Sequence, residues 1–252
     1  MAKLRKLIRT SVLKAKKALK LFVVQIDRET VARTYLGGRG IEIGALHSPL
    51  KVSEKAHVTY VDRMTVSDLL LQYPEMASQQ LVPVDIVADG ERLEPLSDDS
   101  QDFVIANHFI EHCQNPVLAI ENIFRVLKPG GVLYLALPDK RFTFDSARPV
   151  TDIEHLLRDY TEGGQCSRRE HFAEWARLVD GIADGREAEA RVNLLMEQDY
   201  SIHFHVWSQK EMIGLVTFLQ GRYPFDIELM LRSNEEVIFV LRKLEQPHEG
   251  AL

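Results

Sequence analysis

The 252-residue sequence predicts an α/β fold built on a mixed, mainly parallel seven-stranded sheet. Short apolar runs recur between residues 40 and 137, and parallel strands that helices cover on both faces are apolar along their length. Helical patterns lie between several of these runs, as in consecutive strand–helix–strand units. Each run ends in a glycine, an acid or another polar residue. Ligands of such sheets bind outside the carboxyl ends of the strands, so this arrangement predicts an enzyme.

The elements up to residue 137 follow from apolar runs and turn residues. We expect strands at 40–44, 57–62, 83–88, 102–106 and 132–137, and helices at 27–36, 67–80 and 115–128. The last of these helices ends at the sequence LKPGG. Pro129 cannot continue a helix, and Gly130 and Gly131 supply the C-terminal turn.

The rest of the chain predicts an insertion and an antiparallel end of the sheet. Residues 138–207 separate the fifth strand from its return helix, and they contain helices at about 152–160, 168–180 and 186–197. The return helix begins at Ser208, because SQKE matches a capping box. FDIELML and EEVIFVLRK then alternate as two strands joined by a tight Arg-Ser-Asn turn. The insertion opens beside the ligand-binding edge, so we expect it to select the substrate.

The charge distribution argues against a nucleic-acid substrate. Of the 31 basic residues, eight lie in residues 1–22, which hold no acid, so the other 23 are opposed by 37 acidic residues. A surface that binds phosphates needs the opposite balance. The two cysteines, Cys113 and Cys166, form no disulfide framework and indicate structural thiols in a reducing cytoplasm. No apolar stretch is long enough to span a bilayer.

Residues 1–22 predict a basic amphipathic helix. Its apolar residues share one arc and its lysines and arginines fill the opposite one, with Leu13 and Leu21 as exceptions. Such a helix suits the surface of an anionic membrane. Two alternatives remain: a helix that packs on its own domain or on a partner subunit, and a cleaved organelle-targeting segment.

Five segments in order resemble the class I S-adenosylmethionine-dependent methyltransferases. They are the IEIG of the first strand, Asp62, Asp89-Gly90, ANHFIEH and RVLKPGGVLYLALPD. The resemblance implies a Rossmann-like class I methyltransferase fold with strand order 3-2-1-4-5-7-6 and S-adenosyl-L-methionine as cofactor. It also implies a methyltransferase domain over residues 23–245, followed by a tail at 246–252.

The resemblance assigns roles at the strand ends. Gly44 permits the methionine part of the cofactor to approach the backbone, and Glu42 supports that loop or the methionine amine. Asp62 accepts hydrogen bonds from the ribose hydroxyls, and Asp89 binds the adenine amino group beside Gly90, which leaves room for the ring. The expected cofactor-binding residues are Glu42, Gly44, Ala45, Asp62, Arg63, Asp89, Gly90, Asn107 and His108, the last two on the methyl-transfer side.

The glycine loop departs from the family pattern. The usual GxGxG becomes Gly44-Ala45-Leu46-His47-Ser48, in which only the first glycine remains. We interpret this loop as a variant cofactor site. The alternative is a non-catalytic partner subunit that keeps the methyltransferase fold.

A narrower resemblance concerns the acceptor. GALHSPL, PDKRFTFDSARP and HFHVWS are similar to cytoplasmic methyltransferases associated with bacterial surface-polysaccharide assembly. The resemblance implies O-methylation of a saccharide or glycan intermediate at the inner face of the cytoplasmic membrane. A small-molecule or lipid acceptor remains an alternative. Three arginines, Arg148, Arg168 and Arg169, are candidates to bind an anionic sugar or phosphate.

A hydroxyl acceptor must lose a proton, and a positioned histidine accelerates such a transfer. The candidate bases lie in or beside the insertion: His155, His171, His203 and His205. His203 and His205 alternate in IHFHVW, so both side chains can lie on one face of an extended segment. A metal pair is the alternative use, but we expect no metal site in this chain.

The run from His108 to His112 also matches HxxEH, the inverted zinc-hydrolase motif. In that rival function the two histidines hold zinc and Glu111 acts as base. Because the run directly follows a predicted strand, we favour a structural role for Glu111 and His112 at the start of the next helix.

Overall fold

The computed structural model describes residues 26–245. Its strands are β1 (Gly38–Ile43), β2 (Ala56–Asp62), β3 (Ile86–Val87), β4 (Gln101–Asn107), β5 (Leu127–Pro138), β6 (Phe225–Ser233) and β7 (Glu236–Lys243). They form one seven-stranded sheet in the order β3-β2-β1-β4-β5-β7-β6, which confirms the predicted α/β class and strand order. β1 to β5 pair in parallel, and β7 runs antiparallel to β5 and β6. The predicted helix at 1–22 and tail at 246–252 lie outside the described residues.

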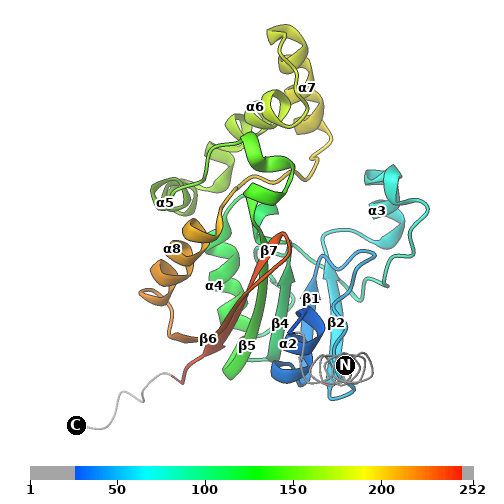
Figure 1. Cartoon of the computed structure of the whole chain (residues 1–252). Coiled ribbons are helices and arrows are strands. Elements are labelled where there is room, and N and C mark those ends of the chain that lie inside the picture. The colour runs from blue at the N-terminus through cyan, green and yellow to red at the C-terminus, as the bar shows by residue number, and fades with distance from the viewer. Residues whose placement is uncertain (1–25, 246–252) are drawn as a thin grey trace, which may run out of the picture.

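Helices cover both faces of the sheet (Figure 1). The α-helices of the described residues are α2 (Arg28–Tyr35), α3 (Val66–Gln72), α4 (Pro116–Val126), α5 (Ile153–Glu162), α6 (Arg168–Leu178), α7 (Gly185–Glu197) and α8 (Gln209–Gln220). The apolar residues of α4 and α8 pack on one face of the sheet, and those of α2 pack on the other. The central strands are therefore buried, as their apolar runs predict.

The insertion after β5 stands beyond the carboxyl ends of the parallel strands (Figure 1). Its helices α5, α6 and α7 begin and end within two residues of the predicted ranges. α6 and α7 share a small core of their own, in which Phe172 and Val192 pack against Ile202 and Phe204. This second core positions the insertion as a separate layer above the ligand-binding edge.

Four predicted boundaries differ from the structure. α3 ends at Gln72 instead of residue 80, because Pro74 begins a short 3-10 helix there. β3 keeps only two of its six predicted residues. α4 ends at Val126, and β5 begins at Leu127, which pairs with Gln101, so LKPGG belongs to an irregular start of the strand.

The hairpin turn also lies further along the chain than predicted. Ser233 pairs with Glu236, so the turn consists of Asn234 and Glu235, whereas the sequence suggested Arg-Ser-Asn. Asn234 has a φ of 52°, and asparagine tolerates this left-handed conformation better than most residues do.

Candidate functional site

The predicted cofactor residues gather at one edge of the sheet. The parallel register places the end of β1 beside β2 and β4, so Gly44, Asp62 and Asn107 lie at adjoining strand ends. Asp62 also pairs with Val87 of β3, which places Asp89 two residues beyond the same edge. The structure thus brings together residues from four strand ends.

Glu42 connects β1 to the loop that follows it. Its side chain is buried, and its two carboxylate oxygens lie 3.0 and 3.2 Å from the amide nitrogen of Leu50, which donates to them. Burial raises the pKa of Glu42 to about 7. The contact holds the loop of residues 44–50 against β1.

Gly44 has a backbone conformation that favours glycine, and the space beside its Cα atom is open. Its φ is 66°, and a Cβ atom added there meets no atom within 4 Å among the described residues. Leu46 in the same loop has a φ of 49°. The variant loop therefore keeps a left-handed turn and leaves space beside Gly44 for a ligand.

The two acids of the neighbouring strands differ in their surroundings. Asp62 is half-buried, it accepts the amide hydrogen of Arg63 at 2.7 Å, and burial raises its pKa. The Arg63 guanidinium bonds Asp199, so that side chain is already engaged. Asp89 is half-exposed and accepts the amide hydrogen of Glu91 at 2.9 Å. Both acids have positions suited to hydroxyl and amino donors of a ligand.

Gly90 and Asn107 differ in their surroundings at this edge of the sheet. A Cβ atom on Gly90 lies 2.7 Å from the Phe109 ring and 2.9 Å from Ile43 Cγ2, so the packing leaves no space for a side chain at this position. Asn107, in contrast, has a buried side-chain amide that makes no well-aligned hydrogen bond among the described residues. The amide lies close to the Glu42 carboxylate, and this contact acts to lower the pKa of Glu42.

His108 lies between two carboxylates directly after β4. Its Nε2 is 2.9 Å from Glu236 Oε2, its Nδ1 is 3.6 Å from Glu111 Oε1, and 42% of its side chain is exposed. Burial acts to lower the pKa of His108, but the Glu236 hydrogen bond and the Glu111 charge outweigh it and raise the pKa. Its φ of 49° is an uncommon conformation for a residue with a side chain, and such residues cluster at functional sites.

The geometry of the HxxEH run differs from a zinc-hydrolase site. Only Ile110–His112 are helical, in a single 3-10 turn, so His108 and His112 do not share a helix face. His112 Nδ1 lies 2.9 Å from the carbonyl oxygen of Ile202. Glu111 is fully buried, and neither carboxylate oxygen has a hydrogen-bond partner among residues 26–245.

The candidate arginines are engaged in ion pairs. Arg148 is fully buried, and it bonds Asp145 at 2.8 Å and Glu174 at 2.7 Å. Arg168 pairs with Asp199, and Arg169 pairs with Glu189. The prediction that Arg148 grips an anionic substrate is therefore wrong, because its whole guanidinium is used inside the insertion.

The four candidate bases divide between two clusters. His203 Nδ1 lies 2.7 Å from Asp145, in a group with Glu111 and His112. The other three histidines, His155, His171 and His205, lie around the carboxylate of Asp159. His203 and His205 thus belong to different groups, although their spacing suggested a shared face.

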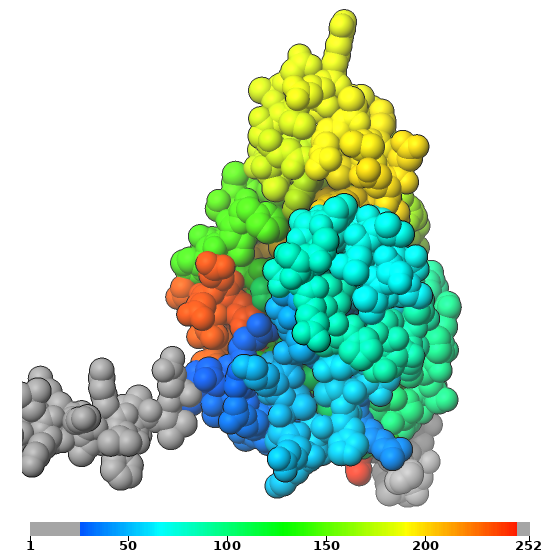
Figure 2. Space-filling view, turned by 90° about the vertical axis from the view of Figure 1, so that its right-hand side faces the viewer, coloured from blue at the N-terminus to red at the C-terminus, as the bar shows by residue number. Residues whose placement is uncertain are grey.

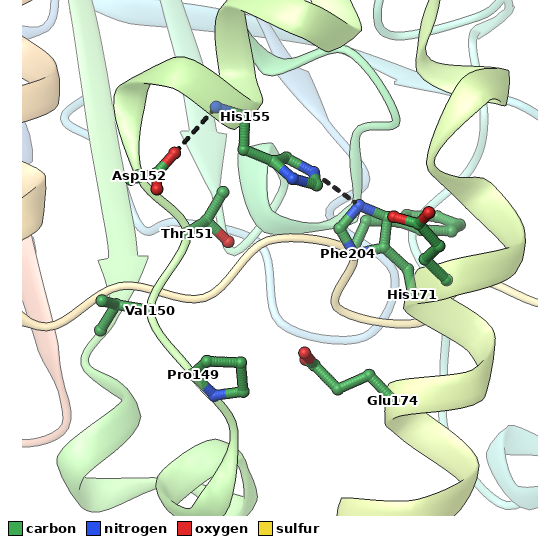
Figure 3. A pocket seen from close by; sticks show the side chains of 9 residues that line it. Pro149, Val150, Thr151, Asp152, His155, His171, Glu174 and Phe204 are labelled. Carbon is green, nitrogen blue, oxygen red and sulfur yellow. Dashed lines mark hydrogen bonds between the residues drawn. The ribbon is translucent and has the colours of Figure 1, made fainter.

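A cavity of about 220 Å³ opens at the second cluster (Figure 3). Its lining combines acids and histidines with an apolar wall: Pro149, Val150, Thr151, Asp152, His155, Glu170, His171, Glu174 and Phe204.

Sequence reasoning missed Glu236, Asp159 and Glu174, because each resembles an ordinary surface acid in its local sequence. Only the i,i+4 spacing of His155 and Asp159 could have indicated that these two side chains meet on one face of a helix.

Contacts between α3 and the end of α7 join the insertion to the sheet. Gln72 Nε2 donates to the carbonyl oxygen of Gln198 at 2.9 Å, and the rings of Tyr73 and Tyr200 are 5.6 Å apart. Figure 2 shows the segment after β2, in cyan, directly beneath the yellow helices of the insertion. The insertion is therefore held at this side as well as through β5.

Residues 38–135, from β1 into β5, match the protein family described as a methyltransferase domain. The uncharacterized protein MJ1123 of Methanocaldococcus jannaschii is 30% identical over 118 residues, which are 47% of this chain and 53% of that protein, about half its length. The solved CurJ carbon methyltransferase is 13% identical with a TM-score of 0.43, over 83% of this chain and 49% of that one. A SAM-dependent methyltransferase from Aquifex aeolicus is 14% identical with a TM-score of 0.41, over 90% and 87%.

Proposed function

We propose that this chain is a class I S-adenosylmethionine-dependent methyltransferase, and that it methylates an oxygen of a neutral saccharide or glycan intermediate. The cavity of the insertion supports this acceptor class. Asp152 and Glu170 offer carboxylates to several hydroxyl donors, while Phe204 and Val150 form an apolar wall for a sugar ring. The same acids repel an anionic acceptor.

The strand ends fit the cofactor. Glu42 and Gly44 would hold its methionine part, Asp62 its ribose and Asp89 its adenine, with the Asn107 amide toward the methyl-transfer side. When bound, S-adenosylmethionine supplies an electrophilic methyl group on a sulfonium. Alignment of acceptor and methyl group then contributes most of the acceleration, about 7–11 kcal/mol in well-oriented systems.

We assign the proton-accepting role to His108. Its side chain is 42% exposed at the end of β4, and Glu236 at 2.9 Å orients the ring and stabilises its protonated form. The four histidines of the insertion are less suitable. They are less accessible than His108, because the side chain of His155 is only 23% exposed and those of His171, His203 and His205 are buried.

The location at the cytoplasmic membrane face rests on residues 1–22, whose basic amphipathic pattern suits an anionic surface. Within residues 26–245, no helix has the length and apolar character needed to cross a membrane. The proposed membrane contact is made by residues 1–22.

Transfer of a radiolabelled methyl group from S-adenosylmethionine tests the function. Neutral oligosaccharides, their anionic counterparts and phospholipid vesicles serve as acceptors. We expect label in an alkali-stable ether of a neutral saccharide, and an about 10²- to 10⁴-fold lower rate for His108→Asn at saturating cofactor. His57→Asn, an exposed histidine on β2, is the control.

Label found only in lipid or protein contradicts the proposed acceptor. Absence of binding heat in a calorimetric titration with S-adenosylmethionine indicates a non-catalytic partner subunit.

A further inference from the structure

We propose that His155, Asp159, His171 and His205 bind one Zn²⁺ ion. They come from three segments of the insertion: α5, α6 and the extended stretch before α8. One ligand atom from each residue lies within 4.8 Å of all the others. This assignment replaces the sequence-based expectation of no metal.

The distances within the cluster suit a tetrahedral ion. His155 Nε2 lies 3.0 Å from His171 Nε2 and 3.1 Å from Asp159 Oδ2, which in turn lies 3.0 Å from His205 Nε2. Zinc binds imidazole nitrogen and carboxylate oxygen at about 2.0–2.2 Å, so ligand atoms of a tetrahedron are roughly 3.4 Å apart. The three measured edges need only small expansion to admit the ion.

The hydrogen-bond pattern leaves a repulsion that a cation removes. His205 Nδ1 lies 3.0 Å from the carbonyl oxygen of Cys113, which only accepts, so this nitrogen carries the ring proton. Nε2 of the neutral ring then directs a lone pair at Asp159 Oδ2. His155 Nε2 faces both Asp159 and His171, and one proton serves only one of these contacts. An ion at the centre satisfies all four groups.

The proposed ligands make the outer hydrogen bonds that metal ligands usually make. A ligating histidine commonly donates its second ring N–H to a backbone carbonyl, as His205 does to Cys113. The Ser167 hydroxyl donates to Asp159 Oδ1 at 2.6 Å and leaves Oδ2 for the ion. Asp159 is fully buried, and His171 and His205 are nearly so. The cluster is thus a shielded site whose ligand atoms are held in place.

One contact must change when the ion binds. Arg158 Nη2 lies 3.4 Å from His155 Nδ1 and also 3.4 Å from Glu170 Oε2. With Nε2 on zinc, Nδ1 of the neutral ring carries the proton and repels the guanidinium. Arg158 then keeps Glu170 as its partner.

Four protein ligands complete a tetrahedral shell, so the ion is structural. It joins α5 to α6 and to the stretch before α8, and the side chains of His155 and His171 point toward each other at the cavity (Figure 3). Zinc therefore fixes one wall of that cavity. Its removal is expected to loosen the insertion without affecting the strand ends.

Metal titration of the untagged full-length chain tests this site. After chelator treatment and dialysis, Zn²⁺ is added in a calorimeter and Co²⁺ in a spectrophotometer, where tetrahedral coordination gives strong visible absorption. The variants are His155→Gln, whose native side chain is 23% exposed, and Asp159→Asn. His112→Gln is the matched control from the group of Glu111, His112 and His203. Circular dichroism verifies the fold of each variant.

We expect the unmodified chain to bind zinc at this site and to give the tetrahedral Co²⁺ spectrum. His155→Gln should weaken that binding more than about 100-fold, because even the loss of an outer contact typically costs about 10- to 100-fold. His112→Gln should retain the spectrum. The proposal is overturned if the unmodified chain takes up no zinc, or if the spectrum is lost in His112→Gln and kept in His155→Gln. Neither readout involves methyl transfer, so the proposed function is tested separately.

Discussion

His108 Nε2 lies 2.9 Å from Glu236 Oε2, although 128 residues separate the two in sequence. The contact exists because β7 inserts antiparallel between β5 and β6, which returns the start of β7 to the ligand-binding edge. Glu236 also pairs with Arg28 at 3.1 Å, so contacts on two sides orient its carboxylate. The antiparallel end of the sheet thereby controls the protonation of the residue that follows β4.

Replacing Glu236 with glutamine should shift the pH dependence of methyl transfer. Glu236 helps to raise the pKa of His108, and a base works only when unprotonated, so activity rises with pH through that pKa. Glu236→Gln removes the negative charge and should move the acidic limb of kcat/KM to lower pH. Glu228→Gln, at the exposed pair with Arg242, is the control. An unmoved limb in Glu236→Gln would show that another group titrates.

Two glycine-to-alanine changes should separate packing from ligand access. Gly90→Ala forces a Cβ against Phe109 and Ile43, so unfolding in urea should show a loss of about 1–3 kcal/mol. Gly44→Ala meets no neighbouring atom but has a φ of 66°, which costs roughly 1–2 kcal/mol. Its methyl group enters the expected cofactor space, so its S-adenosylmethionine affinity should fall as well. Equal cofactor affinity in Gly44→Ala and the unmodified chain would place the methionine part elsewhere.

Arg148→Met should be among the most destabilising single changes in the insertion. It leaves Asp145 buried without its charge partner, and breaking a buried pair in this way typically costs about 3–5 kcal/mol. Arg191→Met removes the half-buried pair with Asp180 and should cost only about 0–1 kcal/mol. Denaturant unfolding of both variants measures the difference. Similar losses would mean that Arg148 does not organise the insertion.

Deletion of residues 1–22 should abolish binding to vesicles that contain anionic lipids. These residues hold eight of the 31 basic side chains, and each contributes roughly 1 kcal/mol near a negative surface. Cofactor affinity should not change. Co-sedimentation with anionic and neutral vesicles provides the measurement, and full retention of binding after deletion rules out this membrane contact.

The strand ends were predictable because their signals are local. Apolar runs that end in Gly44, Asp62, Asp89 and Asn107 are visible in the sequence, and the parallel topology places their ends together. The insertion helices were predictable from periodicity and caps such as Asp152, which accepts the amide hydrogen of His155.

The side-chain clusters were not predictable, because their members meet only through tertiary packing. Asp159 joins His205 across 46 residues, and Arg148 joins Glu174 across 26. The local spacing of His203 and His205 suggested a common face, but the segment is not a strand, and each ring bonds a different acid. Long-range pairing of this kind leaves no pattern in a single sequence.

The most direct test of the central claim is calorimetric titration of S-adenosylmethionine and its demethylated product into the chain and three variants. Asp62→Ala and Asp89→Ala each remove a charged hydrogen-bond acceptor, worth about 1.5–3 kcal/mol, and should weaken binding by at least about tenfold. Asp226→Ala, an exposed acid on β6, should bind like the unmodified chain. Undiminished affinity in folded Asp62→Ala and Asp89→Ala would contradict a cofactor site at these strand ends.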